Sequence, residues 1–187
     1  MTVASNSLAT FNRQKMLDVV HYIVANCTPE ELGNVKLHKV LYFADMLHFV
    51  HTGRPLTGVE YLKQKFGPCA RHLNSVVSSL SKNNKIKVSR RDYFGFTKID
   101  YISIAAPPNK LDNVEIAIID ACMNYVCQRT AKEISELSHN AAWELVKFGE
   151  VIPYETAYWL QHVEVTQEDV NEAVEQLRAI PEFSATT

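Results

Sequence analysis

The sequence predicts an α+β fold that is mainly α-helical, with a small antiparallel β-sheet in a single compact domain. Apolar residues recur with helical spacing in most segments, whereas strand-like alternation is concentrated between residues 85 and 104. No repeat or low-complexity linker interrupts the 187 residues, and 47% of them are hydrophobic, which is enough for one substantial core. We therefore expect residues 1–187 to form one domain with its core at about 11–180.

The first helix is predicted over residues 11–26, where Met16, Val20 and Ile23 share one face before Pro29 breaks the pattern. Residues 35–51 carry apolar side chains around most of the helical circumference. A helix of that kind must be covered on most sides, so this one should be central to the fold.

A turn-rich segment follows, punctuated by glycine and proline, and Tyr61 within it is predicted to start a short strand. Leu73, Val76 and Leu80 then mark another helix. The alternation between Lys85 and Ile104 predicts a β-hairpin that turns around Gly95.

Capping residues define the C-terminal helices. Asp112 can cap a helix that runs to about Gln128, and Thr130 has capping-box spacing to Glu133 before the next one. Thr166 opens a predicted final helix, whose apolar residues are Val170, Val174 and Leu177. Residues 143–146 lie in the helical or turn-rich stretch between them.

Composition argues against several classes of protein. A formal net charge of −2 gives no general reason to expect nucleic acid or an anionic membrane as partner. No apolar run approaches the roughly 20 residues of a membrane span, and the N-terminus lacks signal-peptide order. A cytoplasmic location is therefore expected by default. The four cysteines form neither a CxxC pair nor a disulfide framework, so reduced thiols are expected.

Two blocks of sequence are specific enough to suggest a family. The first block comprises Lys36-Leu37, Leu41-Tyr42-Phe43-Ala44-Asp45, Gly53-Arg54-Pro55-Leu56-Thr57-Gly58, Tyr61 and Gly67-Pro68. The second comprises Leu137-Ser138-His139, Trp143 and Val151-Ile152-Pro153-Tyr154-Glu155. In type, order and spacing these residues resemble the Panacea domain, also called the SocA-like antitoxin domain. The resemblance implies a bacterial or phage antitoxin, not an enzyme, that binds and neutralises a cognate protein toxin.

Other functions remain open at this stage. Within the family, the protein could act as an adaptor that delivers the toxin to a protease. A small hydrolase would use Cys69 with His72, three residues later on the chain, or the polar stripe His38, Tyr42 and Asp45. A transcription factor is disfavoured because no DNA-reading module is evident.

A structural role, and not a catalytic one, is favoured for the polar residues. A buried His or Asp must be paired, so His38, Tyr42 and Asp45 are expected to form a satisfied hydrogen-bond network at the edge of the core. His48 and His51 lack the further ligands that zinc usually requires, and we predict neither a metal nor a cofactor.

Partner-binding residues are predicted from their reach and charge: Lys39, Arg54, Tyr61 and Lys65. The glycines and prolines around them are expected to fix the path of the loop instead, with Gly67 at a special backbone angle. The next candidate surface is the basic edge of the predicted hairpin, from Lys85 to Arg91, whose lysines would also keep an edge strand soluble.

Overall fold

The computed structural model describes residues 10–93 and 95–160, and it confirms a mainly helical α+β fold. The helices are α1 (Arg13–Asn26), α2 (Asn34–Thr52), α3 (Leu73–Lys82), α4 (Asn113–Cys127), α5 (Ala131–Leu137), α6 (Ala141–Glu144) and the 3-10 helix η1 (Tyr154–Leu160). The strands are β1 (Tyr61–Gln64), β2 (Gly67–Ala70), β3 (Ile86–Tyr93), β4 (Phe96–Ser103) and β5 (Val151–Ile152). The final helix predicted at 166–177 lies outside the described residues.

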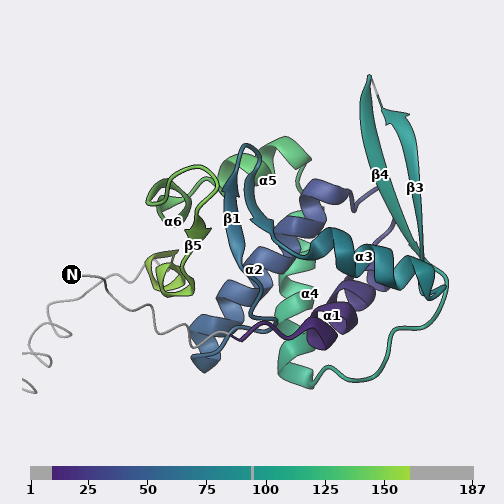
Figure 1. Ribbon diagram of the computed structural model, residues 1–187, viewed down its shortest axis with the longest axis horizontal. Coiled ribbons are helices and arrows are strands. Elements are labelled where there is room, and N and C mark those ends of the chain that lie inside the picture. Colours follow the sequence, from purple (N-terminus) through teal and green to yellow (C-terminus); the bar gives the residue numbers. More distant parts are fainter. Residues whose placement is uncertain (1–9, 94, 161–187) are drawn as a thin grey trace, which may run out of the picture.

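Helix α2 occupies the centre of the fold, as its apolar circumference predicts. It packs against α4, β2, α5 and η1, which surround it in Figure 1. Even its polar residues His38, Lys39 and Asp45 are buried. The helix ends where Gly53 adopts the left-handed conformation and donates its N–H to the Phe49 carbonyl at 2.8 Å.

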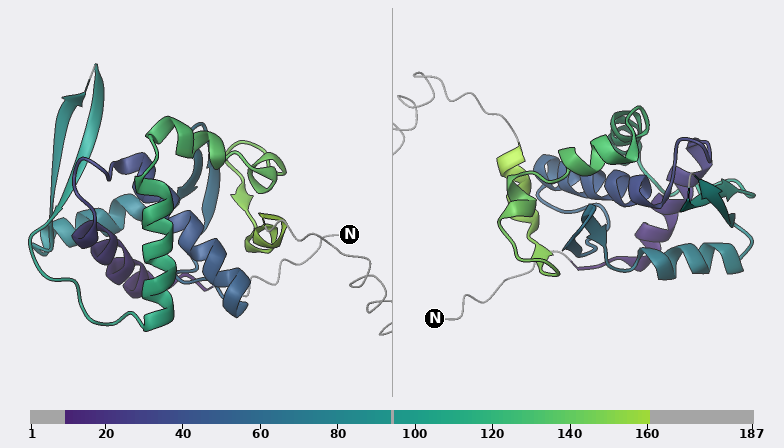
Figure 2. Two further views of the ribbon diagram at one scale, coloured as in Figure 1. Left: turned by 180° about the vertical axis from the view of Figure 1, so that it is seen from behind. Right: turned by 90° about the horizontal axis from the view of Figure 1, so that it is seen from above.

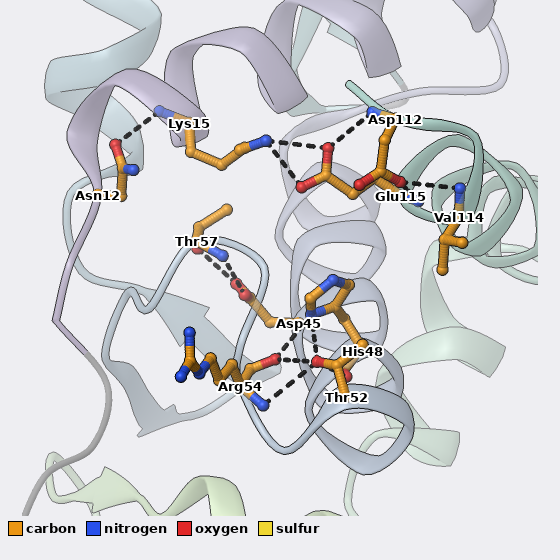
Figure 3. A network of polar contacts seen from close by, with 10 residues as sticks. All are labelled: Asn12, Lys15, Asp45, His48, Thr52, Arg54, Thr57, Asp112, Val114 and Glu115. Carbon is orange, nitrogen blue, oxygen red and sulfur yellow. Dashed lines mark hydrogen bonds and ion pairs between the residues drawn. The ribbon is translucent and has the colours of Figure 1, made fainter. Parts of the chain in front are cut away.

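Helices α1 and α4 are tied together by their capping residues. Asn12 caps α1 by accepting the N–H of Lys15 at 2.9 Å. At the start of α4, Asp112 and Glu115 form a reciprocal capping box. The Glu115 carboxylate also accepts a hydrogen bond from Lys15 Nζ at 2.7 Å, so the Glu115 side chain bonds to the starts of both α1 and α4 (Figure 3).

Two separate antiparallel sheets replace the single small sheet that was predicted. One has the strand order β2-β1-β5, and the other is the hairpin β3-β4. Strand β2 was not predicted because Gly67 and Pro68 usually indicate a turn. Its position at the edge of the sheet accommodates Pro68, since an edge strand can lack a backbone donor on its free side.

The β3-β4 hairpin is the predicted one, with Ile86 opposite Ser103 and Tyr93 opposite Phe96. It projects from the helical body at the end remote from α6 and β5 (Figure 1; Figure 2). Its base is held by packing of β4 against α1 and of β3 against α3.

Gly67 is confirmed at a special backbone angle, with φ of +90° at the start of β2. A Cβ atom built there would overlap Ser138 Oγ and would lie 2.6 Å from Lys39 Nζ. Gly67 therefore allows β2 to approach both α2 and the end of α5. Gly53 offers a contrast, because its φ is +73° but no atom lies within 4 Å of its added Cβ.

We predict that Gly53→Ala lowers the free energy of unfolding by roughly 1–2 kcal/mol, the cost of the left-handed conformation alone. Gly67→Ala should cost an additional roughly 1–3 kcal/mol because the new Cβ also overlaps its neighbours. Urea unfolding of the two variants beside the wild type measures both values. Equal losses would show that Gly67 does not hold the close approach of β2 to α2.

Candidate functional site

Asp45 lies at the middle of α2 with its carboxylate fully buried. It accepts three hydrogen bonds of 2.6 Å, from the N–H and the hydroxyl of Thr57 and from the hydroxyl of Tyr61. Figure 3 shows the pair of bonds between Asp45 and Thr57. Burial raises the pKa of Asp45, while these hydrogen bonds act to lower it. The carboxylate thus anchors the turn segment and β1 to α2.

His38, one helical turn before Tyr42, is bonded to β2. Its Nδ1 accepts the N–H of Ala70 at 3.0 Å, which leaves the proton of the neutral ring on Nε2. Nε2 faces Cys69 Sγ at 3.5 Å. Burial lowers the pKa of His38 to about 4, so the ring is neutral at pH 7. In this tautomer Nε2 donates to the sulfur and cannot serve as a base for the thiol.

The other pairing considered for Cys69 is not formed. His72 is exposed and stacks on the ring of Phe11, with the ring centroids 4.8 Å apart. Burial raises the pKa of the Cys69 thiol, which keeps the less reactive thiol form. Neither histidine therefore activates this cysteine.

The predicted polar stripe is buried, but it does not form one network. His38 bonds to β2, and Asp45 bonds to the turn segment and β1. The Tyr42 hydroxyl between them forms no well-placed hydrogen bond with any of the described residues. The expectation of a fully satisfied network is therefore wrong at Tyr42.

Lys39 is buried with only 2% of its surface exposed. Its Nζ donates to the Pro68 carbonyl at 3.0 Å, and no carboxylate of the described residues lies within ion-pair distance of it. Burial lowers the pKa of Lys39 to about 7. A lysine that is buried without a counter-charge is rare, because the ammonium loses its hydration.

Two further unpaired polar atoms lie close to this part of α2. They are His139 Nε2 and Trp143 Nε1, and with the Tyr42 hydroxyl they are the buried side-chain atoms without a partner in the described part of the chain. The rings of His139 and Trp143 stack with centroids 4.0 Å apart, and Lys63 Nζ lies 3.9 Å from the centroid of the Trp143 ring.

Asn140 connects the two groups. Its Oδ1 accepts the N–H of Trp143 at 3.1 Å. Its side chain also makes a polar contact with the Tyr42 hydroxyl, too poorly placed for a full hydrogen bond, and this contact opposes the rise in the pKa of Tyr42 that burial causes. Burial nevertheless raises the pKa of Tyr42 to about 12. Lys39 in turn helps to lower the pKa of His139, after burial, which places α2 and the α5–α6 junction in electrostatic contact. We call Lys39, Tyr42, His139 and Trp143 the polar centre.

The predicted partner-binding residues divide into two pairs. Arg54 and Lys65 are exposed, as expected for contact residues. The assumption that Lys39 and Tyr61 are exposed is wrong, because α2 is covered where Lys39 lies and the Tyr61 hydroxyl is needed by Asp45. The Arg54 carbonyl accepts His48 Nδ1 at 2.7 Å and the Thr52 hydroxyl at 2.9 Å, which shapes the turn (Figure 3).

An exposed apolar surface lies where the β1-β2 turn meets the segment from α5 to β5. Its residues are Phe66 (60% exposed), Leu137 (48%), Leu145 (57%) and Phe148 (68%). Ser135 Oγ donates to the Phe66 carbonyl at 2.7 Å, and Gly149 donates to the Lys63 carbonyl at 2.9 Å, so the turn and the segment are bonded together. We call these four residues and Lys65 the hairpin face, after the β1-β2 hairpin and not the β3-β4 hairpin. The sequence did not reveal this face, since periodicity does not tell which apolar residues another element covers.

A second apolar feature is a groove of about 320 Å³ between α2, α4 and η1. Its lining residues are Phe43, Met46, Leu47, Val50, Ala121, Cys122, Tyr125 and Ala157. The basic edge of the β3-β4 hairpin is also exposed, as predicted, although Arg91 pairs with Asp100 at 2.6 Å. The described residues hold no group of His, Cys, Asp or Glu able to bind a metal ion, and His48 is bonded within its turn.

Comparison with known proteins identifies the family. The model of the family "Antitoxin SocA-like, Panacea domain" matches residues 37–144, more than half of the chain. The chain therefore belongs to the SocA-like Panacea antitoxin domain family. No curated protein and no solved structure gives a significant match. Within residues 10–93 and 95–160, no helix is long and apolar enough to cross a membrane. That residues 1–187 form a single domain stays a prediction.

Stability should depend on pH through Lys39. Its pKa is about 7 in the folded protein and near 10.5 in the unfolded chain, so the unfolded chain binds more protons between these values. We therefore expect the Lys39 contribution to raise the free energy of unfolding by roughly 2 kcal/mol from pH 7 to pH 9. Lys39→Met should remove that rise in urea unfolding at pH 7, 8 and 9.

The control for lost positive charge is Lys87→Met, which removes an exposed lysine from β3. If Lys39→Met gains stability with pH as steeply as the wild type does, the Lys39 ammonium is stabilised in the folded protein in some other way.

Proposed function

We propose that this protein is an antitoxin that neutralises a cognate protein toxin by binding it directly, as a non-enzymatic protein of the cytoplasm. Membership of the SocA-like Panacea family supports the antitoxin role. The observation that carries direct binding is the hairpin face, a surface whose apolar side chains are between 48% and 68% exposed. Exposed apolar patches on soluble domains typically mark sites where another protein binds.

The hairpin face has the composition of a binding interface. Phe66 and Phe148 are large aromatic anchors, and Lys65 supplies a positive charge at the rim. The backbone beneath them is fixed by hydrogen bonds from Ser135 and Gly149, so a partner would meet a preorganised surface. Arg54, the other exposed residue predicted to bind, lies at the end of α2 and outside this face.

The geometry weighs against the hydrolase alternative. The Cys69 thiol is approached by the protonated nitrogen of His38, and its own pKa is raised by burial. The Asp45 carboxylate is occupied by three donors and is fully buried, which removes it from contact with a substrate. Catalysis by the predicted polar stripe would need these groups to exchange partners first.

Co-expression with the toxin encoded by the adjacent gene distinguishes direct inhibition from delivery to a protease. Direct inhibition should restore growth while the amount of toxin, measured by immunoblot, stays unchanged. An adaptor would instead deplete the toxin, and deletion of the responsible protease would restore both toxin and toxicity. Growth arrest that persists with folded wild-type protein present would contradict the antitoxin role for that toxin.

The interface is tested by Phe66→Ser combined with Leu137→Ser. Because both side chains are already exposed, the melting temperature should change little, whereas toxin affinity should fall at least about tenfold through loss of anchors. Calorimetric titration and melting curves on the same samples measure the two effects.

Val114→Ser is the control, since Val114 is 49% exposed, close to the 48% of Leu137, and lies at the start of α4, the end of that helix remote from the hairpin face (Figure 1). Tyr125→Ser tests the groove between α2 and α4 in the same assay. Loss of affinity in Tyr125→Ser but not in the double variant would move the interface to the groove.

A further inference from the structure

The polar centre combines two features that native structures rarely leave together. Lys39 is buried with no carboxylate of the described residues in reach, and the buried Tyr42 hydroxyl has only a poorly placed polar contact with the Asn140 side chain. Buried charges are normally paired, and more than about nine in ten buried polar groups are hydrogen-bonded. Moreover, the other unpaired buried atoms in the described residues, on His139 and Trp143, lie beside the same part of α2.

We infer that the polar centre is a binding site for a carboxylate group, held by Lys39, Tyr42, His139 and Trp143. The supply of donors sets the class of ligand. Trp143 Nε1 can only donate, and the Lys39 ammonium has three protons, of which Pro68 takes one. The Tyr42 hydroxyl adds a further donor. Such a set requires an acceptor with negative charge, because a cation or a donor-rich ligand would leave Lys39 unpaired.

A carboxylate suits the site better than a larger anion. Its two oxygens accept about four hydrogen bonds, which corresponds to the donors that the polar centre presents. The atoms concerned are buried, so a small group would require the least rearrangement of the side chains around them. A carboxylate here would also supply the missing counter-charge to Lys39 and raise the lowered pKa of that residue toward its ordinary value.

The site adjoins the hairpin face, which suggests how a carboxylate reaches it. Trp143 is only partly buried, and Lys63 lies over its ring. Lys63 is bonded through its backbone to Gly149 and Glu150, next to Phe148 of the hairpin face. An acidic side chain of a toxin docked on that face, or a free carboxylate, would enter where Lys63 and Trp143 meet. The first source rests on the proposed function, whereas the second does not.

Acetate tests the site without any toxin. In ¹H–¹⁵N spectra, the indole N–H of Trp143 should shift downfield and saturate as sodium acetate is added, with sodium chloride of equal ionic strength as the reference. The chain has one other tryptophan, Trp159, which is 62% exposed and whose indole signal should not move. Equal shifts of both indoles, or none, would overturn the site.

Tyr42→Phe is the sharpest variant because it deletes one unpaired hydroxyl and keeps the ring. Its thermal stability should equal or exceed that of the wild type, while acetate affinity falls several-fold. Lys39→Met should abolish the acetate shift, and the exposed Lys87→Met should retain it. If Tyr42→Phe is less stable and binds acetate as the wild type does, the hydroxyl has a structural water as its partner and the inference fails.

Neutralisation identifies the source of the carboxylate. If the toxin supplies it, Tyr42→Phe and Lys39→Met should lose toxin affinity at least tenfold while remaining folded. If these variants bind the toxin normally but lose acetate binding, the natural ligand is a free small carboxylate. Failure of the wild type to neutralise would refute the proposed function and leave the acetate experiment unaffected.

Discussion

The buried Asp45 carboxylate is the constraint on which the rest of the fold depends. A carboxyl group inside the core is tolerated only when hydrogen-bond partners replace its water, and here Thr57 and Tyr61 supply them. Satisfying this one group therefore fixes the turn segment after α2 and the start of β1. Since β1 is the middle strand of its sheet, the positions of both β2 and β5 follow from the same requirement.

From β1 the constraint extends to the hairpin face. The β1-β2 turn carries Phe66 outward, and Ser135 of α5 secures the backbone at that point. The edge of β1 opposite to β2 pairs with β5, and this pairing brings the loop containing Phe148 to the same side. The apolar residues of the hairpin face thus come from distant parts of the chain but rest on a scaffold anchored in the core. A rigid scaffold reduces the entropy lost when a partner binds.

Local signals in the sequence predicted most elements correctly, including the central helix, the Asp112 cap, the Thr130–Glu133 capping box and the β3-β4 hairpin, because these depend on neighbouring residues. Burial of individual polar residues was not predictable in the same way. Lys39 and Tyr61 were expected at the surface on account of their charge and polar tip, yet partners far along the chain, Pro68 and Asp45, hold them inside. Strand β2 was missed for a related reason, since only its place at a sheet edge makes Pro68 acceptable.

At the polar centre, the residues present are not those that the stability of the fold would favour. Methionine at position 39 would fill a similar volume without the cost of dehydrating an ammonium, and phenylalanine at position 42 would avoid an unpaired hydroxyl. Stability alone thus gives no reason for either residue. Gly67 adds to the cost, because a left-handed glycine is needed to leave room for Lys39 Nζ. Several destabilising choices that meet at one point are typical of a binding site, where stability is given up for a preorganised set of donors.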